Sequence, residues 1–376
     1  MGPLSGVKVI EMSGLAPGPY CAMLLADLGA EVLRIAKPDE SAPLARRFQA
    51  LHRNRRSIGV DLKSTAGVSL AMELISRADA LIEGYRPGVM EKLGLGPASC
   101  LERNPSLVYG RMTGWGQTGP LASLGGHDIN YIALAGVLDS VGEEGRPPSI
   151  PLNVVGDFGG GGLFLAFGIV SALLERTHSG KGQVIDAAMI DGASSLMSYM
   201  HGVQASGAWR GRGTSAISGA APHYSVYKTS DNRYVSVGAS EQKYFEKLIR
   251  LMGLQPGALA DHRDPANWEQ LKKIFAGIFE MKTRAEWIDL LQHEDVCFAP
   301  VLGIEEVESH PHQMARNAFV SVGGEMQSAP APRFSRTTPH TPTPGVHAGV
   351  DIVAALGPWG YTPEKAQELK SAGIAS

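Results

Sequence analysis

Short apolar runs alternate with longer stretches of helical periodicity along the first half of the chain. In the longer stretches apolar residues recur three and four positions apart, as on one face of a helix. The short runs predict strands at Val7–Met12, Glu31–Ile35, Ser57–Leu62, Ala80–Glu83, Leu107–Met112 and Gln183–Ala188. Strands that alternate with helices imply βαβ units, so we expect an α/β domain with a mostly parallel sheet.

The second half of the chain has a different pattern. Residues 207–221 are rich in Gly, Ser and Ala without periodicity, and we interpret them as a linker. Residues 222–330 then predict a smaller α+β domain with a hairpin at Tyr224–Lys228 and Arg233–Gly238 and helices near Glu241–Met252, Pro265–Glu280 and Thr283–Gln292. Residues 331–376 begin as a proline-rich extended arm and end in a helix at Thr362-Pro363, which we expect to return to the large domain at 1–206.

Composition narrows the class of protein. The chain has 376 residues, 44% of them apolar, and a net charge of −3, so it gives no general reason to expect nucleic acid or an acidic membrane as a partner. Its three cysteines lie far apart, which favours a reducing, cytoplasmic location without a disulfide framework or a cysteine-bound metal. The uncharged stretch Gly159–Leu174 is shorter than the ~20 residues of a membrane span, and we interpret it as a buried helix.

Basic residues cluster in the first hundred positions. The cluster contains Arg46, Arg47, Arg53, Arg55 and Arg56, followed by Lys63, Arg86 and Lys92. Lys37 follows the second predicted strand, where a protein that binds NAD would carry an acidic residue. These residues suit an anionic ligand with several phosphates, because arginine recognises phosphate with paired hydrogen bonds. A solvated basic surface would have the same composition.

Three residues are candidates for acid/base chemistry. His127 and Asp157 each lie beside glycines, and they could be the two proton-transfer groups on either side of one reacting carbon. His127 could equally be an ordinary core histidine, and Asp157 could be a helix N-cap. Glu241 stands where a predicted helix begins, and there an acid is also favourable to the helix dipole.

Several motifs recur in the same order in a known family. They include Gly14-Leu15-Ala16-Pro17-Gly18-Pro19, Asn54-Arg55-Arg56-Ser57, Asp61-Leu62-Lys63, Gly84-Tyr85-Arg86-Pro87-Gly88-Val89, Gly114-Trp115-Gly116-Gln117-Thr118-Gly119-Pro120, Gly126-His127-Asp128-Ile129-Asn130-Tyr131, Gly156-Asp157-Phe158-Gly159-Gly160-Gly161 and Gly180-Lys181-Gly182-Gln183. From about residue 4 to 335 the chain resembles the class III CoA-transferase family, and the His-Asp-Ile-Asn-Tyr form resembles its racemase branch.

The resemblance implies a Rossmann-like large domain, a smaller α+β domain and an interlocked homodimer. It assigns His127 and Asp157 as the acid/base pair and Glu241 as the acid beside the histidine. With the basic cluster, it gives a predicted CoA site made of Lys37, Arg55, Arg56, Val60, Asp61, Leu62, Lys63, Gly84, Tyr85, Arg86, Lys92, Gly126, Asp128, Ile129, Asn130 and Tyr131.

The implied reaction is inversion of the C2 centre of a 2-methylacyl-CoA thioester. His127 and Asp157 would exchange one proton across the two faces of an enolate, and backbone N–H groups near Asp157 would stabilise the enolate oxygen. No separate cofactor or metal is expected, because CoA is bound as part of the substrate. Two alternatives are a CoA-transferase in which Asp157 attacks the thioester, and a regulatory protein that binds CoA without turnover.

Overall fold

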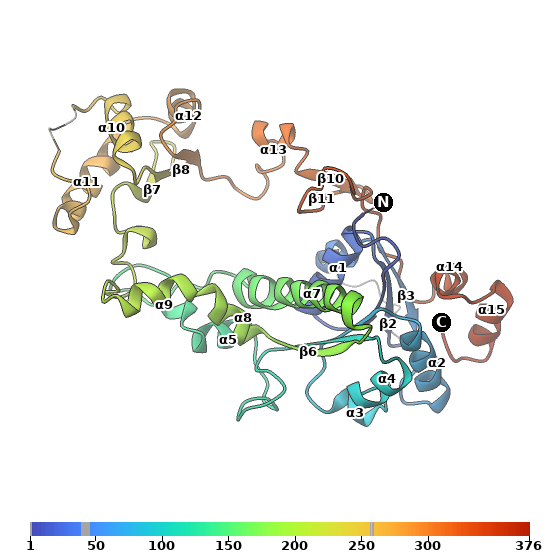
Figure 1. The fold of residues 1–376 in the computed structure, drawn as a ribbon. Coiled ribbons are helices and arrows are strands. Elements are labelled where there is room, and N and C mark those ends of the chain that lie inside the picture. The colour runs from blue at the N-terminus through green and yellow to red at the C-terminus, as the bar shows by residue number, and fades with distance from the viewer. Residues whose placement is uncertain (1, 39–45, 256, 258) are drawn as a thin grey trace. The chain divides into compact units, whose positions relative to one another are not determined.

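The structure, a computed structural model, is a mixed α/β fold (Figure 1). It describes residues 2–38, 46–255, 257 and 259–376, and the side chains of residues 46–48 lie outside this description. The chain divides into two compact units. The first comprises Met1–Ala135, Leu152–Met197 and Met314–Ser376, and the second comprises Gly136–Pro151 and Ser198–Gln313.

A six-stranded parallel sheet forms the centre of the first unit. The strands β1 (Lys8–Met12), β2 (Glu31–Ala36), β3 (Arg55–Gly59), β4 (Ala80–Glu83), β5 (Val108–Thr113) and β6 (Gln183–Ala188) lie in the order β3-β2-β1-β4-β5-β6. All six were predicted, to within three residues at each end. This strand order is that of the doubly wound nucleotide-binding folds. The chain leaves β1 toward one edge of the sheet and later returns to β4 beside it, so the order reverses between β1 and β4.

Helices cover both faces of this sheet and bury two apolar clusters. One face packs against α1 (Pro17–Asp27) and α7 (Phe164–Ser179), and further around against α5 (Asp128–Leu134) and α8 (Met189–Leu196). The other face packs against α2 (Thr65–Ser76), α3 (Val89–Lys92), α4 (Pro97–Arg103), α14 (Ile352–Leu356) and α15 (Pro363–Ser371). A sheet covered on both faces explains why its strands read as short apolar runs instead of alternating patterns.

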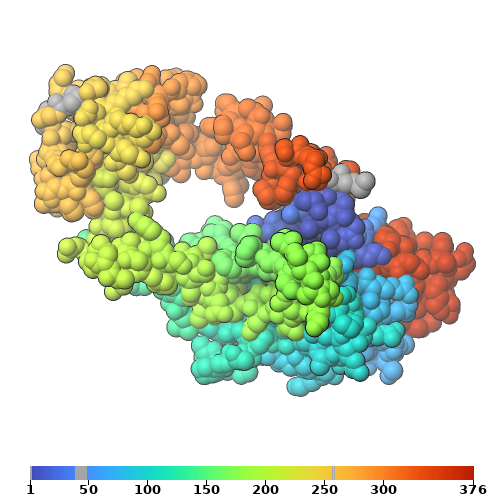
Figure 2. All heavy atoms as spheres, viewed as in Figure 1, coloured from blue at the N-terminus to red at the C-terminus, as the bar shows by residue number. Residues whose placement is uncertain are grey.

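The C-terminal segment completes the first unit, as predicted. The N–H of Ser376 donates to the carbonyl of Gly59, and the N–H of Gly59 donates to that of Ser376, which closes the outer edge of β3. In Figure 2 this segment lies in red beside the light-blue residues of β3 and α2. The hairpin of β10 (Phe319–Val322) and β11 (Glu325–Ser328) also belongs to this unit, because Arg53 donates to the carbonyl of Ser328 at 2.7 Å.

The second unit has its own antiparallel sheet and core. Strands β7 (Tyr224–Lys228), β8 (Tyr234–Gly238) and β9 (Phe298–Pro300) pack against α10 (Gln242–Leu251), α11 (Trp268–Phe279) and α12 (Arg284–Leu291) around a cluster rich in aromatic side chains. The predicted hairpin and the three predicted helices are present. The short helices α6 (Val137–Ser140) and α9 (Ser198–Ala205) also belong to this unit, and α13 (Pro311–Ala315) lies where the chain passes from one unit to the other.

The unit boundaries differ from the predicted domain boundaries in three segments. Residues 136–151 and 198–206 belong to the second unit and residues 314–330 to the first. The predicted linker at 207–221 is packed, since Arg212 donates to Asp139 at 2.8 Å and to the carbonyl of Arg146 at 2.6 Å. A positive φ of 74° at Gly213 brings its backbone against Glu143 and Glu144.

The long apolar helix starts earlier than predicted. A π-helix, η2 (Val154–Leu163), runs directly into α7, and together they form one helical segment of 26 residues. In length and composition this segment could cross a membrane, although the core helix of a soluble protein passes the same test. Forty-four percent of its most apolar stretch is buried within the fold, whereas Phe167 and Leu174 are 70% and 63% exposed.

Candidate active site

A cavity of about 470 Å³ opens at the carboxyl edge of the parallel sheet. It lies beside the ends of β1, β4 and β5, which includes the point where the strand order reverses. Open α/β sheets bind their ligands at this position, because the loops after two neighbouring strands diverge there. Apolar side chains line much of the cavity, among them Ile82, Met112, Trp115 and Met189.

His127 lies in the wall of this cavity, at the residue before α5. Its backbone is extended, and its N–H donates to the side-chain oxygen of Asn130 at 3.0 Å, which fixes the entry to the helix. The residue is exposed, so the alternative of an ordinary buried core histidine is wrong. Its neighbour Gly126 has no room for a side chain, because a Cβ there would lie 2.7 Å from the ring of Tyr131.

Asp157 lies in the wall of the same cavity, in the first turn of η2. The alternative of a helix N-cap is wrong, because η2 begins three residues earlier. The N–H of Asp157 donates to the Asp128 carboxylate at 2.7 Å, and the Asn153 amide donates to the Asp157 carboxylate at 2.9 Å. The side chain is therefore held at two points.

The environment of Asp157 favours a protonated carboxyl group. Burial raises the pKa of Asp157 above its ordinary value, and the nearby Asp128 carboxylate raises it further. The hydrogen bond from Asn153 and the neighbouring His127 act in the opposite direction, but burial prevails. Asp157 can thus donate a proton nearer neutral pH than an exposed aspartate can, while the imidazole of His127 faces the same space.

Five of the residues predicted to bind CoA line this cavity: Gly84, Tyr85, Arg86, Gly126 and Tyr131. Tyr131 is 6% exposed and packs edge-on against Trp115, with 4.7 Å between the ring centroids. The other predicted residues that follow strands lie at the same edge of the sheet: Lys37 after β2, and Val60, Asp61, Leu62 and Lys63 after β3. Lys37, Asp61 and Lys63 are exposed, whereas the Val60 side chain is 2% exposed and could offer a ligand only its backbone.

Arg55 is a correction to the predicted CoA site. Its side chain is 1% exposed and forms an ion pair with Glu11, whose carboxylate is fully buried in β1. Arg53 is buried in the same way, in an ion pair with Asp27. Both guanidinium groups hold the fold together and cannot reach a ligand. Arg56 is 41% exposed and pairs with Glu31 at 3.2 Å, and the side chains of Arg46 and Arg47 lie outside the described residues.

Asp128 is a second correction to the predicted CoA site, because its side chain is buried and bonds to the backbone of the protein itself. It is 7% exposed, and one carboxylate oxygen is occupied by the N–H of Asp157. That N–H was a predicted donor to the enolate oxygen and is therefore committed elsewhere. The exposed residues Ile129, Asn130 and Lys92 lie in helices α5 and α3 and are not among the residues that line the cavity.

Glu241 lies in the second unit, as the residue before α10. It is exposed, and its carboxylate makes no hydrogen bond to the start of the helix. A favourable interaction with the helix dipole needs no such hydrogen bond, so that alternative stays open, and the contact of Glu241 with His127 stays a prediction.

Of two residues that hold the site, one had been missed in the sequence and the other had been given a different role. Asn153 supports the Asp157 carboxylate but stands in a loop with no recognisable motif. Asp128 had been assigned to CoA, although an acid directly after His127, at the start of a helix, was a signal for an internal role. Within the described ranges no group of three or more His, Cys, Asp and Glu side chains is arranged to hold a metal ion.

Comparisons with known proteins show what the chain as a whole is similar to. Residues 4–348 match the family described as CoA-transferase family III. The chain is 43% identical to an alpha-methylacyl-CoA racemase of Mus musculus, across 98% of this chain and 96% of the relative. It is 44% identical to the alpha-methylacyl-CoA racemase of Homo sapiens, across 89% and 87%. A crystal structure of a CAIB/BAIF family protein from Brucella suis superposes with a TM-score of 0.82 at 28% identity, covering 92% of this chain and 96% of that one.

Proposed function

This chain belongs to CoA-transferase family III, and from its 43–44% identity to two alpha-methylacyl-CoA racemases we propose that it is an isomerase that inverts the C2 centre of 2-methylacyl-CoA thioesters. The observation that carries the proposal is that His127 and Asp157 line one cavity from two different elements. This placement supports a two-base reaction, because such a reaction needs a single carbon within reach of both groups.

The reaction transfers one proton at a time. One group removes the C2 proton from its own face, and the electron pair passes to the thioester oxygen as an enolate. The other group then donates a proton to the opposite face, and the two exchange roles for the opposite epimer. A raised pKa suits Asp157 to the donor role, since a general acid is most effective when its pKa lies near the working pH.

The lining of the cavity suits the two halves of such a substrate. Arg86 supplies a positive charge for the CoA portion, while the half-buried Trp115 and the exposed Leu124 offer apolar contacts for an acyl chain. The chemistry as proposed uses side chains of this protein alone, with CoA bound as part of the substrate.

We also propose that the protein acts as a homodimer. Leu163, Phe167 and Leu174 project from the long apolar helix and are 50% to 70% exposed in the isolated chain. Contiguous apolar surface of this kind is typical of a protein interface. Analytical ultracentrifugation tests this, and a monomer at micromolar concentration would contradict it. In such an assembly Glu241 would hydrogen-bond to His127 and fix its tautomer.

Proton exchange tests the function. Incubation of either epimer of a 2-methylacyl-CoA in deuterated water should place deuterium at C2 and yield both epimers, with no second carboxylic acid present. The rival function in this family is CoA transfer, in which Asp157 attacks the thioester carbonyl. Transfer of CoA to an added acid, with no C2 exchange in its absence, would favour that rival and refute the isomerase.

A further inference from the structure

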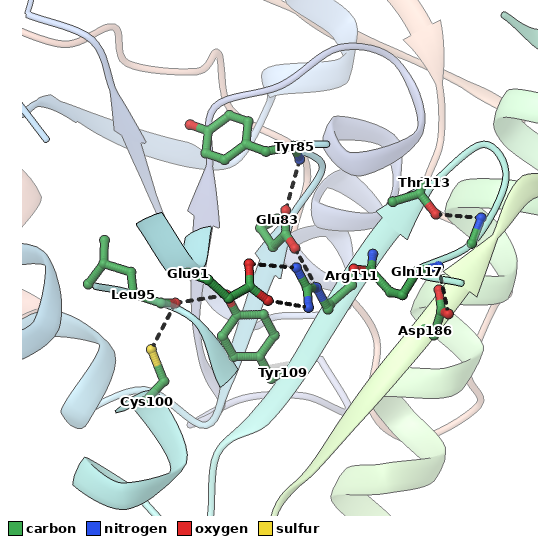
Figure 3. A network of polar contacts seen from close by, with 11 residues as sticks. Glu83, Tyr85, Glu91, Leu95, Cys100, Tyr109, Arg111, Thr113, Gln117 and Asp186 are labelled. Atoms are coloured by element: carbon green, nitrogen blue, oxygen red, sulfur yellow. Dashed lines mark hydrogen bonds and ion pairs between the residues drawn. The ribbon is translucent and has the colours of Figure 1, made fainter. Parts of the chain in front are cut away.

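Three charged side chains form one row across neighbouring strands, next to the cavity. Glu83 in β4 is in register with Arg111 in β5, and Arg111 is in register with Asp186 in β6. Glu83 is fully buried and Arg111 is 7% exposed. Figure 3 shows this row together with its hydrogen-bond partners.

Glu83 and Arg111 of this row hold the turn after β4 at the start and at the end of the turn. One oxygen of Glu83 accepts the N–H of Tyr85 at 2.8 Å, and the other accepts Nε of Arg111 at 2.8 Å. The two terminal nitrogens of Arg111 donate to the two oxygens of Glu91 in α3, at 2.8 and 3.2 Å. Arg86 lies between these two attachment points, so its backbone is fixed on either side.

The other end of the row holds the turn after β5 in the same manner. The Asp186 carboxylate accepts the N–H of Gln117 at 2.9 Å, and the Thr113 hydroxyl accepts the N–H of Gly116 at 3.0 Å. This turn carries Trp115, which lines the cavity together with Arg86. Each of the two turns that meet at the cavity is thus tied to a carboxylate in the charged row.

Stability alone does not account for these contacts. Buried ion pairs add little net stability, because removing two charges from water offsets most of their attraction. An apolar pair would fill the same space between β4 and β5, yet it could not accept the N–H of Tyr85 or reach Glu91 with two parallel hydrogen bonds. What the row adds is a defined geometry for the turn, since a bidentate pair fixes orientation as well as distance.

The turn that these hydrogen bonds fix carries the Arg86 side chain. It is exposed and lines the cavity, and a Cβ on Gly125 would lie 3.5 Å from one of its terminal nitrogens. We propose that Glu83, Arg111 and Glu91 are positioning residues that aim Arg86 at the phosphate-bearing part of a CoA thioester. This inference rests on the proposed function, because it takes an acyl-CoA as the ligand of the cavity.

The central experiment replaces Arg111 by lysine. Lysine keeps the positive charge but cannot donate to Glu83 and to both oxygens of Glu91 at once. We expect Arg111→Lys to raise the KM for 2-methylacyl-CoA roughly tenfold and to leave kcat within about twofold, because it removes binding that the ground and transition states share. With the matching pantetheine thioester, which lacks the nucleotide phosphates, KM should not change. Equal losses with both substrates would overturn the inference.

A double-mutant cycle isolates the role of Arg86. By calorimetry with free CoA, Arg86→Ala should weaken binding, and Arg111→Lys added to Arg86→Ala should weaken it no further. If the two losses multiply, Arg111 does not act through Arg86 and the inference is wrong. This measurement needs no turnover. If the wild-type protein does not exchange C2 protons but the losses of CoA affinity in the cycle are non-additive, the proposed function is refuted while the positioning network is supported.

A milder variant covers the case in which Arg111→Lys does not fold. Glu91→Gln alters the exposed end of the network, where the side chain is 45% exposed, and should weaken CoA binding by about threefold. Glu73→Gln is the matched control: Glu73 is also 45% exposed and pairs with Arg77 at 2.5 Å on α2, outside the cavity lining. Equal CoA affinities in the Glu91 and Glu73 variants would overturn the inference.

Discussion

Losing one of the two proton-transfer groups should abolish exchange for one epimer and preserve it for the other. In Asp157→Asn, His127 still removes the C2 proton that faces it and returns deuterium from solvent to the same face. For the epimer whose C2 proton faces residue 157, no base is left to remove that proton. Asparagine keeps the shape of the side chain and an oxygen that can accept from the Asn153 amide, now 2.9 Å away, so the loop should remain in place.

The size of the loss follows from the role of the group. A positioned acid or base contributes about 10²–10⁴ in rate, so exchange of the unserved epimer should fall by that factor. At 1.36 kcal/mol per tenfold this is about 2.7–5.4 kcal/mol of barrier. Exchange of the other epimer should stay within roughly tenfold of the wild-type rate. Conversion of one epimer into the other needs both groups, so its rate should fall by the same factor as the slower exchange.

The assay is deuterium incorporation at C2 of each resolved epimer, followed by NMR in deuterated water. His127→Gln should show the mirror image, retaining exchange only for the epimer served by Asp157. Calorimetry with CoA should give similar affinities for both variants and the wild type, which excludes loss of binding as the cause. The two-base account fails if both variants lose the same epimer, or if Asp157→Asn slows both epimers equally.

Three further predictions concern stability and packing. Because burial raises the pKa of Asp157, the stability it contributes is full below the unfolded value of about 4 and is lost as the pH rises through the folded value. As the pH rises above about 4, Asp157→Asn should therefore gain melting temperature relative to the wild type, and a difference that stays constant with pH would contradict this. Burial lowers the pKa of His223, so the stability that this residue contributes is full above about pH 6.5 and is lost as the pH falls. His223→Phe should therefore lose less melting temperature on acidification than the wild type does, and an unchanged dependence of melting temperature on pH would contradict this. A Cβ on Gly114 would lie 2.0 Å from the ring of Tyr131, so Gly114→Ala should cost about 1–3 kcal/mol of unfolding free energy and lower kcat/KM. Gly202→Ala, where no atom lies within 4 Å, should do neither, and equal denaturation midpoints for the two variants would refute the overlap.

The strands of the large unit could be predicted from the sequence, but the packing of the linker could not. Each parallel strand is a short apolar run between helices, so periodicity located it. The stretch at 207–221 lacks periodicity, and its order comes from contacts between Arg212 and residues more than sixty positions earlier. Such contacts leave no local pattern, because the partners, the Asp139 carboxylate and the Arg146 carbonyl, are distant in sequence and a carbonyl can be supplied by any residue.

Charge composition also led to the wrong assignment of Arg55 to the CoA site, because the partner of this residue is distant in sequence. A cluster of arginines looks the same in sequence whether its members face a ligand or a buried carboxylate. The distinguishing signal lay in the partner, since Glu11 stands between the apolar residues Ile10 and Met12 of a predicted strand, and a buried acid requires a cation. Asp27, at the end of α1, plays the same part for Arg53. A search for unexplained acids in predicted core elements would have separated these two arginines from Arg86.

The glycine run after Asp157 lies directly against the backbone of neighbouring helices. A Cβ on Gly160 would lie 2.6 Å from the Ala193 nitrogen in α8, and one on Gly162 would lie 2.5 Å from the Pro17 carbonyl in α1. The glycines therefore let the π-helix sit directly on two neighbouring helices, where a side chain would hold them apart. Asp157 lies in the first turn of that π-helix, and π-helical turns frequently occur at functional sites. Close packing behind Asp157 and the Asp128 carboxylate at its N–H together hold it in the cavity wall, so the site depends on backbone contacts as much as on its own side chains.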